Sequence, residues 1–508
     1  MNRPTLRRRL AATGATLLLV TLGACSTGTD TASDSTSSST TSSSTSGTAV
    51  DATSISSTVP TLDDTHAQAN DAEYDAAGAT AIALADGAST VDGSGAEVDG
   101  DVVTVTKAGT YTVSGSLSDG QVVVDSASDG KVVLVLDGAD ISSASTSPLV
   151  VTAADEAVVI LADGSTNSLS DSAASSADDE QEDAPNATLF SMADLTIAGT
   201  GPLEITGASN DGITSKDGLV ILSGDITVDA ADDGIRGKDY LVIEDGTITV
   251  DAGGDALKSD SDTAGELGWI LVDSGTVTAS GTSDGADAVG AVYVVDGTVT
   301  VPEAGEGLEA PVITITGGTV DVTTSDDGLN ATDGSVAGGG EDAEEGVLLR
   351  ISGGTVLIAA GSDGIDSNGS ATITGGTTAI STSSAGGGGG GTGALDVNGT
   401  LTAPATLTVT TDGLTAGQTV TVEDSDGNQV ASFVPSDGAS SFLVVAEGLV
   451  SGDSYTVSAD GTDLGTVTAA DAASAGGGGR GGPGGGGGPY DGGPGGDPFA
   501  DDDGTTGS

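Results

Sequence analysis

The sequence is poor in cysteine, histidine and aromatic residues. Its 508 residues contain one cysteine, Cys25, and one histidine, His66. A single cysteine excludes an intrachain disulfide. A single histidine near the N-terminus excludes Ser-His-Asp, Cys-His and multi-histidine metal chemistry from the body of the chain. Because aromatic residues make up 2% of the chain, Val, Ile, Leu, Ala and Thr must fill a narrow core.

Positive charge is also scarce. The chain has 12 basic and 76 acidic residues, which gives a formal net charge of −64 at pH 7. We therefore expect no nucleic-acid partner, and no binding to an anionic bilayer through charge. Divalent cations, or ligands bridged by them, are the partners that this charge favours.

The N-terminal segment predicts a lipoprotein signal. Arg7-Arg8-Arg9 precedes an apolar run from Leu10 to Leu22, and Leu22-Gly23-Ala24-Cys25 follows. This order is typical of a secretory signal peptide with a lipobox, and the apolar run is too short to span a membrane. We expect removal of residues 1–24 and a diacylated Cys25 that anchors the chain to the outer face of the cell membrane. A plain signal peptide with an incidental cysteine is the alternative.

Composition divides the rest of the chain. Residues 25–60 are rich in Ser and Thr and predict a disordered stalk, and residues 473–508 are rich in Gly and Pro and predict a disordered tail. Residues 61–400 are β-rich and repetitive. Residues 401–472 lose the repeat and predict a small antiparallel β module, which we expect to cover the open end of the repeats.

A glycine followed by a short β-branched run recurs seven times. The glycines are Gly224, Gly246, Gly275, Gly297, Gly318, Gly354 and Gly376. The steps between them are 22, 29, 22, 21, 36 and 22 residues. A period near 22, with three short strands per period and Gly, Asp or Ser at the corners, predicts an all-β fold. The expected architecture is a parallel β-helix, a solenoid of about 22 residues per coil with loops at the longer steps.

An acidic residue repeats at the same steps. These residues are Asp211, Asp233, Asp255, Asp284, Glu306, Asp327 and Asp363. Stacked coils would place them in one column about 5 Å apart, where neighbouring charges repel by about 3 kcal/mol at an effective dielectric constant of 20. Ca²⁺ would neutralise them. The candidate ligands are Asp211, Asp217, Asp232, Asp233, Asp239, Asp255 and Asp260. A structural interpretation stays open, because Asp-Gly is a favourable corner whose Asp side chain bonds local backbone amides.

Four basic residues lie in the same stretch: Lys216, Arg236, Lys238 and Lys258. Arg236 and Lys258 each follow the repeated aliphatic residue, so they would stack on consecutive coils. One interpretation is internal ion pairing with the aspartates. The other is a groove for uronic-acid carboxylates, in which Arg236, Lys238 and Lys258 bind the ligand and Trp269, beside an insertion, stacks on a sugar.

Several stretches carry a family resemblance: Gly109-Thr-Tyr-Thr-Val-Ser-Gly, Val135-Leu-Asp-Gly-Ala, Ser209-Asn-Asp-Gly-Ile, Asp232-Asp-Gly-Ile-Arg-Gly-Lys-Asp and Gly254-Asp-Ala-Leu-Lys-Ser-Asp. They resemble extracellular carbohydrate-binding-domain lipoproteins of the clostridial type, which bind cellulose and acidic sugars through a right-handed, pectate-lyase-like parallel β-helix. The resemblance spans about residues 80 to 400. It implies right-handed coils, Ca²⁺ sites on the helix, and polysaccharide binding without cleavage.

These observations favour a monomeric cell-surface lipoprotein that binds an acidic or plant-wall polysaccharide through a Ca²⁺-bearing β-helix and is not an enzyme. Two alternatives stay open. A Ca²⁺-dependent, pectate-lyase-like enzyme would use Lys258 or Arg236 as its base. A structural or adhesive wall protein would use the β-helix as a rigid spacer.

Overall fold

The computed structural model describes residues 58–172, 184–261, 267–334, 342–383, 393–410, 414–436 and 438–472, and the fold is reported for these residues. The expected signal peptide, Cys25, nearly all of the stalk, and the tail from residue 473 lie outside them. The described part consists of strands and three short 3-10 helices, η2 (Leu62–Asp64), η3 (Ala69–Ala72) and η4 (Ala76–Gly78). Its helices are too short to cross a bilayer.

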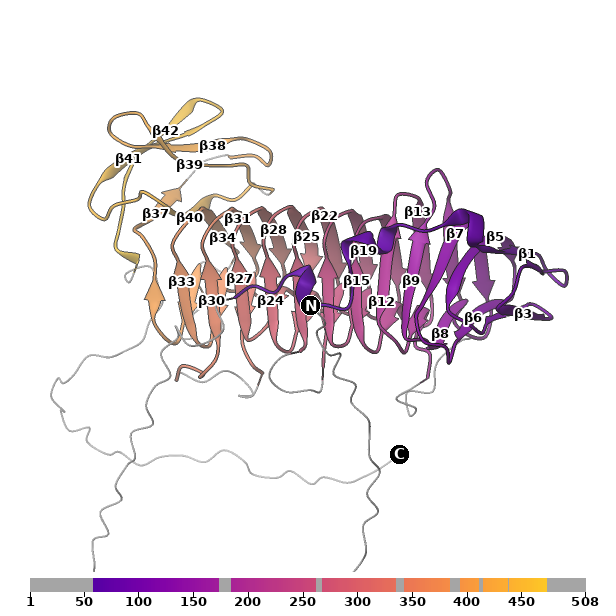
Figure 1. The fold of residues 1–508 in the computed structure, drawn as a ribbon. Helices are drawn as coiled ribbons and strands as arrows, with labels where there is room; N and C mark the ends of the chain where they lie inside the picture. Colours follow the sequence, from indigo (N-terminus) through magenta and orange to yellow (C-terminus); the bar gives the residue numbers. More distant parts are fainter. Residues whose placement is uncertain are drawn as a thin grey trace, which may run out of the picture. The chain divides into compact units, whose positions relative to one another are not determined.

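Most strands stack in three runs of parallel strands, and each coil contributes one strand to each run (Figure 1). Run 1 contains β1 (Thr80–Leu84), β5 (Gly109–Leu117), β7 (Lys131–Ser143), β9 (Glu156–Leu161), β12 (Leu195–Gly199), β15 (Gly218–Ile221), β18 (Tyr240–Ile243), β21 (Trp269–Val272), β24 (Ala291–Val294), β27 (Val312–Ile315), β30 (Leu348–Ile351), β33 (Ser370–Ile373) and β36 (Leu401–Thr402). Run 2 begins with the C-terminal ends of β5 and β7, and continues with β10 (Asn167–Asp171), β13 (Pro202–Gly207), β16 (Asp225–Ala230), β19 (Thr247–Ala252), β22 (Thr276–Gly281), β25 (Thr298–Ala304), β28 (Thr319–Thr324), β31 (Thr355–Ala360) and β34 (Thr377–Thr382). Run 3 contains β4 (Val102–Val105), β6 (Gln121–Asp125), β8 (Leu149–Ala153), β11 (Ala187–Ser191), β14 (Asp211–Ser215), β17 (Ile235–Gly237), β20 (Leu257–Ser259), β23 (Asp284–Ala288), β26 (Glu306–Glu309), β29 (Leu329–Ala331), β32 (Ile365–Ser367) and β35 (Leu395–Val397).

The core lies inside the coils and is built from aliphatic ladders. In run 2, Ile226 pairs with Ile248, and Ile248 pairs with Val277. These inward residues are buried, whereas the intervening Thr and Asp side chains of β16 and β19 are exposed. The described chain is therefore all-β with long parallel-strand sheets, as the repeat predicts, and this arrangement is consistent with a β-helix or solenoid.

The glycine after the repeated acid is required by packing between coils. A Cβ at Gly234 would lie 2.2 Å from Val250 Cγ1. In the following coil Ala256 stands in place of this glycine, and the residue paired with Val250 is the smaller Ala279. A larger side chain at one position is thus matched by a smaller one at the other. This exchange keeps the volume constant, which closely packed cores tolerate best.

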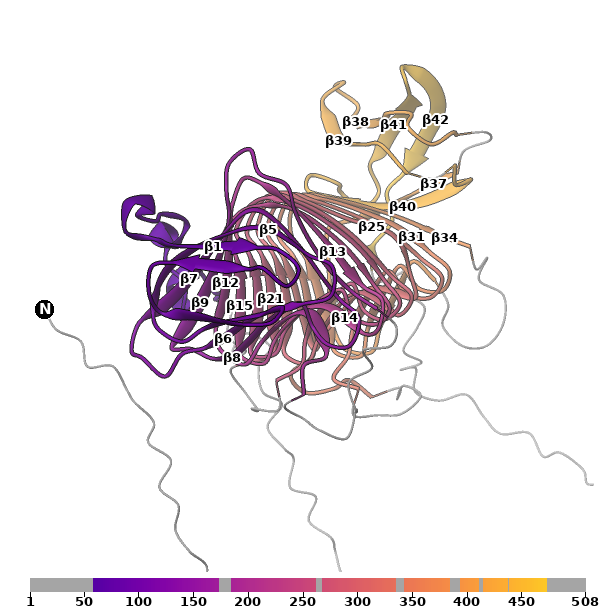
Figure 2. The same ribbon diagram turned by 90° about the vertical axis from the view of Figure 1, so that its right-hand side faces the viewer.

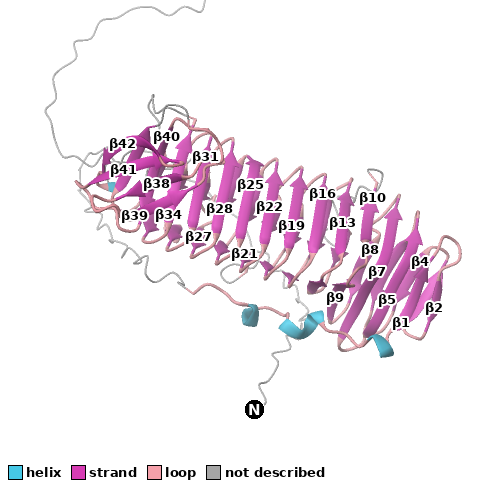
Figure 3. Ribbon diagram, turned by 90° about the horizontal axis from the view of Figure 1, so that it is seen from above, coloured by secondary structure: helices cyan, strands magenta, loops and turns pink. Residues whose placement is uncertain are grey.

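The N-terminal end and the C-terminal region complete the sheets with antiparallel strands. At the N-terminal end, β2 (Thr90–Asp92) pairs with β1, and β3 (Ala96–Asp99) pairs with β4. After run 1 come β37 (Thr406–Thr410), β38 (Val420–Glu423), β39 (Gln429–Phe433), β40 (Ser441–Ala446), β41 (Ser454–Ala459) and β42 (Thr462–Thr468), which pair with one another antiparallel. Strand β40 also pairs antiparallel with β34, the last strand of run 2, so this sheet edge is covered (Figure 3).

Residues 58–79, here called the N-terminal strap, lie against the outer face of run 1 and carry η2, η3 and η4 (Figures 1 and 2). Ala67 is buried among the outward side chains of β15, β18 and β21, and Leu62 packs on the same cluster. The Lys131 ammonium bonds Asp71 of the strap and Glu156 of β9, at 2.6 Å each. The strap explains why outward residues of β15, β18 and β21 are buried, in contrast to those of run 2.

Candidate functional site: a carboxylate ladder on run 3

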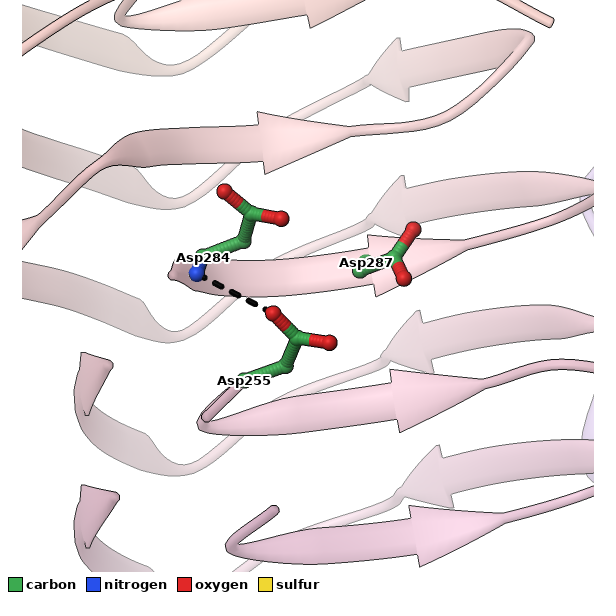
Figure 4. A group of neighbouring side chains, drawn as sticks. All are labelled: Asp255, Asp284 and Asp287. Carbon is green, nitrogen blue, oxygen red and sulfur yellow. Dashed lines mark hydrogen bonds between the residues drawn. The ribbon is translucent and has the colours of Figure 1, made fainter. Parts of the chain in front are cut away.

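One acidic residue per coil forms the first column of a carboxylate ladder on run 3. Its members are Asp211, Asp233, Asp255, Asp284, Glu306, Asp327 and Asp363, each at or just before the start of a run 3 strand. Asp255 Oδ1 accepts a hydrogen bond from the Asp284 N–H at 3.1 Å (Figure 4). Asp284 Oδ1 accepts one from the Glu306 N–H at 3.3 Å. The carboxylate oxygens thus lie in a line. They also accept hydrogen bonds from backbone N–H groups of the next coil, as the structural interpretation of these corners requires.

A second column lies three residues further along each coil. Strand register aligns Thr214, Arg236, Lys258, Asp287, Glu309, Asn330, Asp366 and Asp396 in this order. The column is cationic at Arg236 and Lys258 and acidic from Asp287 onward, except at the neutral Asn330. The basic residues of the second column therefore neutralise first-column acids in one half of the ladder. In the other half, its acidic residues add further negative charge.

In the first half the cations are used in ion pairs. Arg236 holds Asp260 with two bonds, Nε to Oδ1 at 2.9 Å and Nη2 to Oδ2 at 2.5 Å. Lys258 Nζ lies 2.5 Å from Asp255 Oδ2 and 3.3 Å from Asp233 Oδ2. Burial disfavours the charged lysine, but its bond to Asp255 and the surrounding aspartates outweigh this and raise the pKa of Lys258. The interpretation as internal ion pairing thus describes these two cations.

In the second half the carboxylates gather in two groups, and Lys258 Nζ reaches only the first of them, at Asp255 and Asp287. The oxygens of Asp255, Asp284 and Asp287 lie within 4.8 Å of one another, and so do those of Asp284, Glu306 and Glu309 (Figure 4 shows the first group). No ion pair to Lys or Arg among the described residues reaches Asp284, Glu306 or Glu309. Burial, and then the charges of neighbouring acids, raise the pKa of Asp284 to about 7. Burial also raises the pKa of Glu306 to about 8.

Asn330 adds a neutral oxygen beside the second group. Its Nδ2 donates a hydrogen bond to Glu306 Oε2 at 2.6 Å, while its Oδ1 is buried and has no hydrogen-bond partner. A buried oxygen without a donor is rare and needs an explanation. A hard cation bound by Asp284, Glu306 and Glu309 would supply it, because Ca²⁺ is held by carboxylate and amide oxygens. The donor set contains no nitrogen or sulfur, so it does not suit Zn²⁺.

The remaining predicted ligands lie apart from these two groups. Asp211 is buried at the first coil of the ladder, where burial raises its pKa to about 7. Asp232 is exposed next to the first column. Asp217 and Asp239 occupy equivalent corners before β15 and β18, and burial raises the pKa of Asp217 to about 6. Lys238 is half-buried and directly follows β17. Of the seven predicted ligands, only Asp255 belongs to one of these two groups, and its Oδ2 is paired with Lys258.

Trp269 lies on run 1, not on the ladder. Its ring stacks on Tyr240 at 5.0 Å, and Tyr240 stacks on His66 of the N-terminal strap at 5.9 Å. Trp269 is only 9% exposed. A sugar could therefore reach this ring only after the strap had moved away.

Sequence reasoning did not single out Glu309 or Asn330. The signal was present, because both lie three residues after the repeated acid, where Arg236 and Lys258 stand in earlier coils. The change of residue type along the column concealed it.

Comparison with known proteins supports the family resemblance. Residues 99–347 match the family model described as "Carbohydrate-binding domain-containing protein". A protein of that same description from Acetivibrio thermocellus is 37% identical over 128 residues, which are 25% of this chain and 45% of the relative. The chain thus spans less than half the length of this relative.

A solved structure also matches, that of the polysaccharide lyase-like protein from C. thermocellum, as a gadolinium derivative. It is 30% identical, with a TM-score of 0.40, and the match covers 50% of this chain and 98% of that one. The family model and the relative from Acetivibrio thermocellus support the resemblance to carbohydrate-binding-domain proteins.

Proposed function

We propose that this protein binds polysaccharide without cleaving it, and that its carboxylate ladder holds Ca²⁺ for this purpose. The observation that carries the proposal is the group of Asp284, Glu306 and Glu309, which no described cation neutralises, with the partnerless Asn330 oxygen beside it. A bound Ca²⁺ would neutralise these acids and could bridge them to ligand carboxylates. The favoured ligand is consequently an acidic glycan, although the protein itself is strongly negative.

Ion pairing argues against the lyase alternative. A proton-abstracting lysine needs a lowered pKa, whereas the pKa of Lys258 is raised by its aspartate partners. Arg236 is fixed by two bonds to Asp260. A cleaving role for either side chain would require these ion pairs to open.

The wider setting of the proposal follows the sequence. The signal peptide and lipidated Cys25 would place a monomeric binding domain, a right-handed β-helix of about 22 residues per coil, on the outer face of the cell membrane. Residues 25–60 would act as the spacer between lipid and domain. Metabolic labelling with a fatty acid, compared with Cys25→Ser, tests this anchoring.

The metal test uses calorimetric titration of the full mature protein with Ca²⁺. Glu306→Gln with Glu309→Gln should weaken Ca²⁺ binding at least tenfold, because it removes two of the three carboxylates. Asp225→Asn with Asp229→Asn, exposed on β16, is the matched control for loss of two charges. Equal Ca²⁺ affinity in both double variants would refute the site.

The glycan test is affinity electrophoresis through polygalacturonate. We expect retardation in Ca²⁺ that EDTA abolishes and that the glutamine double variant lacks. A new absorbance near 235 nm on incubation with polygalacturonate and Ca²⁺ would instead establish the lyase.

A further inference from the structure

A hollow of about 550 Å³ lies where the strands of run 2 end, at the C-terminal ends of β19, β22, β25 and β28. None of the ladder carboxylates of run 3 lines it. The residues that matter for its chemistry are Asp251, Ser280, Thr282, Pro302, Glu303 and Thr323. The hollow is therefore a separate feature from the ladder.

Pro302 is the physical cause of the hollow. The pairing of β22 with β25 stops after Thr278 and Thr300. The register between β25 and β28 shifts between Val301 and Ala304, where β25 carries one extra residue. Proline has no N–H to continue the ladder and is confined to bulges and edges of sheets. The strands part at this point, and bulges of this kind commonly re-aim side chains beside binding sites.

The lining has a definite chemistry. It offers hydroxyl groups from both sides of the bulge and two exposed carboxylates, Asp251 and Glu303. Among the residues that the structure describes, none of those lining it is basic or aromatic. Carboxylates accept, and Ser and Thr hydroxyls both donate and accept, so the hollow suits a ligand rich in hydroxyl groups. With no cation present, and with two negative charges at its rim, it disfavours a ligand that carries carboxylates.

We propose that this hollow, here called the bulge groove, is a second glycan subsite that binds a neutral oligosaccharide segment and needs no metal. Its volume lies within the range of small-ligand sites, about 300–1,000 Å³. The inference rests on the proposed glycan-binding function but differs from it in site, ligand charge and metal dependence. The ladder would bind uronates through Ca²⁺, and the bulge groove would bind neutral sugar hydroxyls directly.

The test fills the groove without changing charge. Ser280→Tyr places a ring in the hollow from β22. Thr278→Tyr is the matched control, because Thr278 lies two residues earlier on the same strand and face and does not line the groove. Both variants and the parent protein are run through gels that contain neutral polysaccharides (glucan, xylan or mannan) in EDTA, and through polygalacturonate in Ca²⁺.

We expect a neutral polysaccharide to retard the parent protein in EDTA, and Ser280→Tyr to weaken this binding at least tenfold. Thr278→Tyr should bind like the parent, and all three should bind polygalacturonate equally in Ca²⁺. Retention by polygalacturonate alone would overturn the bulge groove and leave the ladder proposal standing. Equal neutral binding by both tyrosine variants would also overturn it. If the parent protein binds the neutral polysaccharide as expected but does not bind polygalacturonate in Ca²⁺, the result counts against the ladder and supports the groove.

Discussion

Removal of metal should make the stability of this protein depend on pH in an unusual direction. In the folded state the pKa values of Asp284 and Glu306 are about 7 and about 8, whereas their ordinary values are 3.8 and 4.5. The folded protein then binds protons more tightly than the unfolded chain between these values. In EDTA, the free energy of unfolding should therefore rise as the pH falls from 8.5 to about 5, and level off near pH 4.

The magnitude follows from the shifts. A shift of about three units in a fully buried carboxyl corresponds to about 4 kcal/mol. Part of each pKa shift comes from repulsion between neighbouring acids, so the two shifts cannot simply be added. Solvent also screens the half-buried Glu306 carboxylate. We expect a combined gain of about 2–4 kcal/mol between pH 8.5 and pH 5. Asp366, whose pKa burial raises to about 7, acts in the same direction.

Urea denaturation at several pH values, in EDTA and in Ca²⁺, measures this directly. Glu306→Gln with Glu309→Gln should flatten the pH dependence in EDTA, and the exposed pair Asp225→Asn with Asp229→Asn should not. Ca²⁺ at one hundred times its dissociation constant would add about 2.7 kcal/mol. At a fixed Ca²⁺ concentration the gain should be larger at pH 8 than at pH 5.5, because protons compete with the cation. A metal-free protein that is most stable at pH 8.5 would refute the reasoning.

Three further results are expected. Ala279→Val should lower the free energy of unfolding by about 1–3 kcal/mol through overpacking, and adding Ala256→Gly should restore it; a double-mutant cycle in urea without coupling would count against the packing argument. Lys258→Met should cost about 3–5 kcal/mol, because it leaves buried aspartates unpaired, and the loss should be equal in EDTA and in Ca²⁺. Leu62→Asp should release the N-terminal strap and shift the fluorescence of Trp269, the single tryptophan, to the red; an unchanged spectrum would show that the strap is not what shields the ring.

The repeat made much of the fold predictable. The β-branched runs that follow Gly224 and Gly246 correspond to β16 and β19, because their hydrophobic pattern and corner residues recur at a fixed step. The ladder was predictable for the same reason. The role of Lys258 was not, since one spacing fits both an ion pair and a ligand site. The strap was not predictable either, because the bond between the His66 N–H and Tyr240 Oη spans 174 residues and belongs to no repeat.

The distance in sequence between His66 and Tyr240 implies that the strap docks after the coils it covers have formed. Coils can add one upon another as the polypeptide emerges, since each contacts mainly the coil before it. The segment around His66 is made early, yet its partners on β18 and β21 follow only after some 174 residues. The strap cannot dock until these strands have formed, and contacts so distant in sequence form slowly. A blue shift of Trp269 emission during refolding would thus report the docking of the N-terminal strap on β18 and β21 rather than the first collapse.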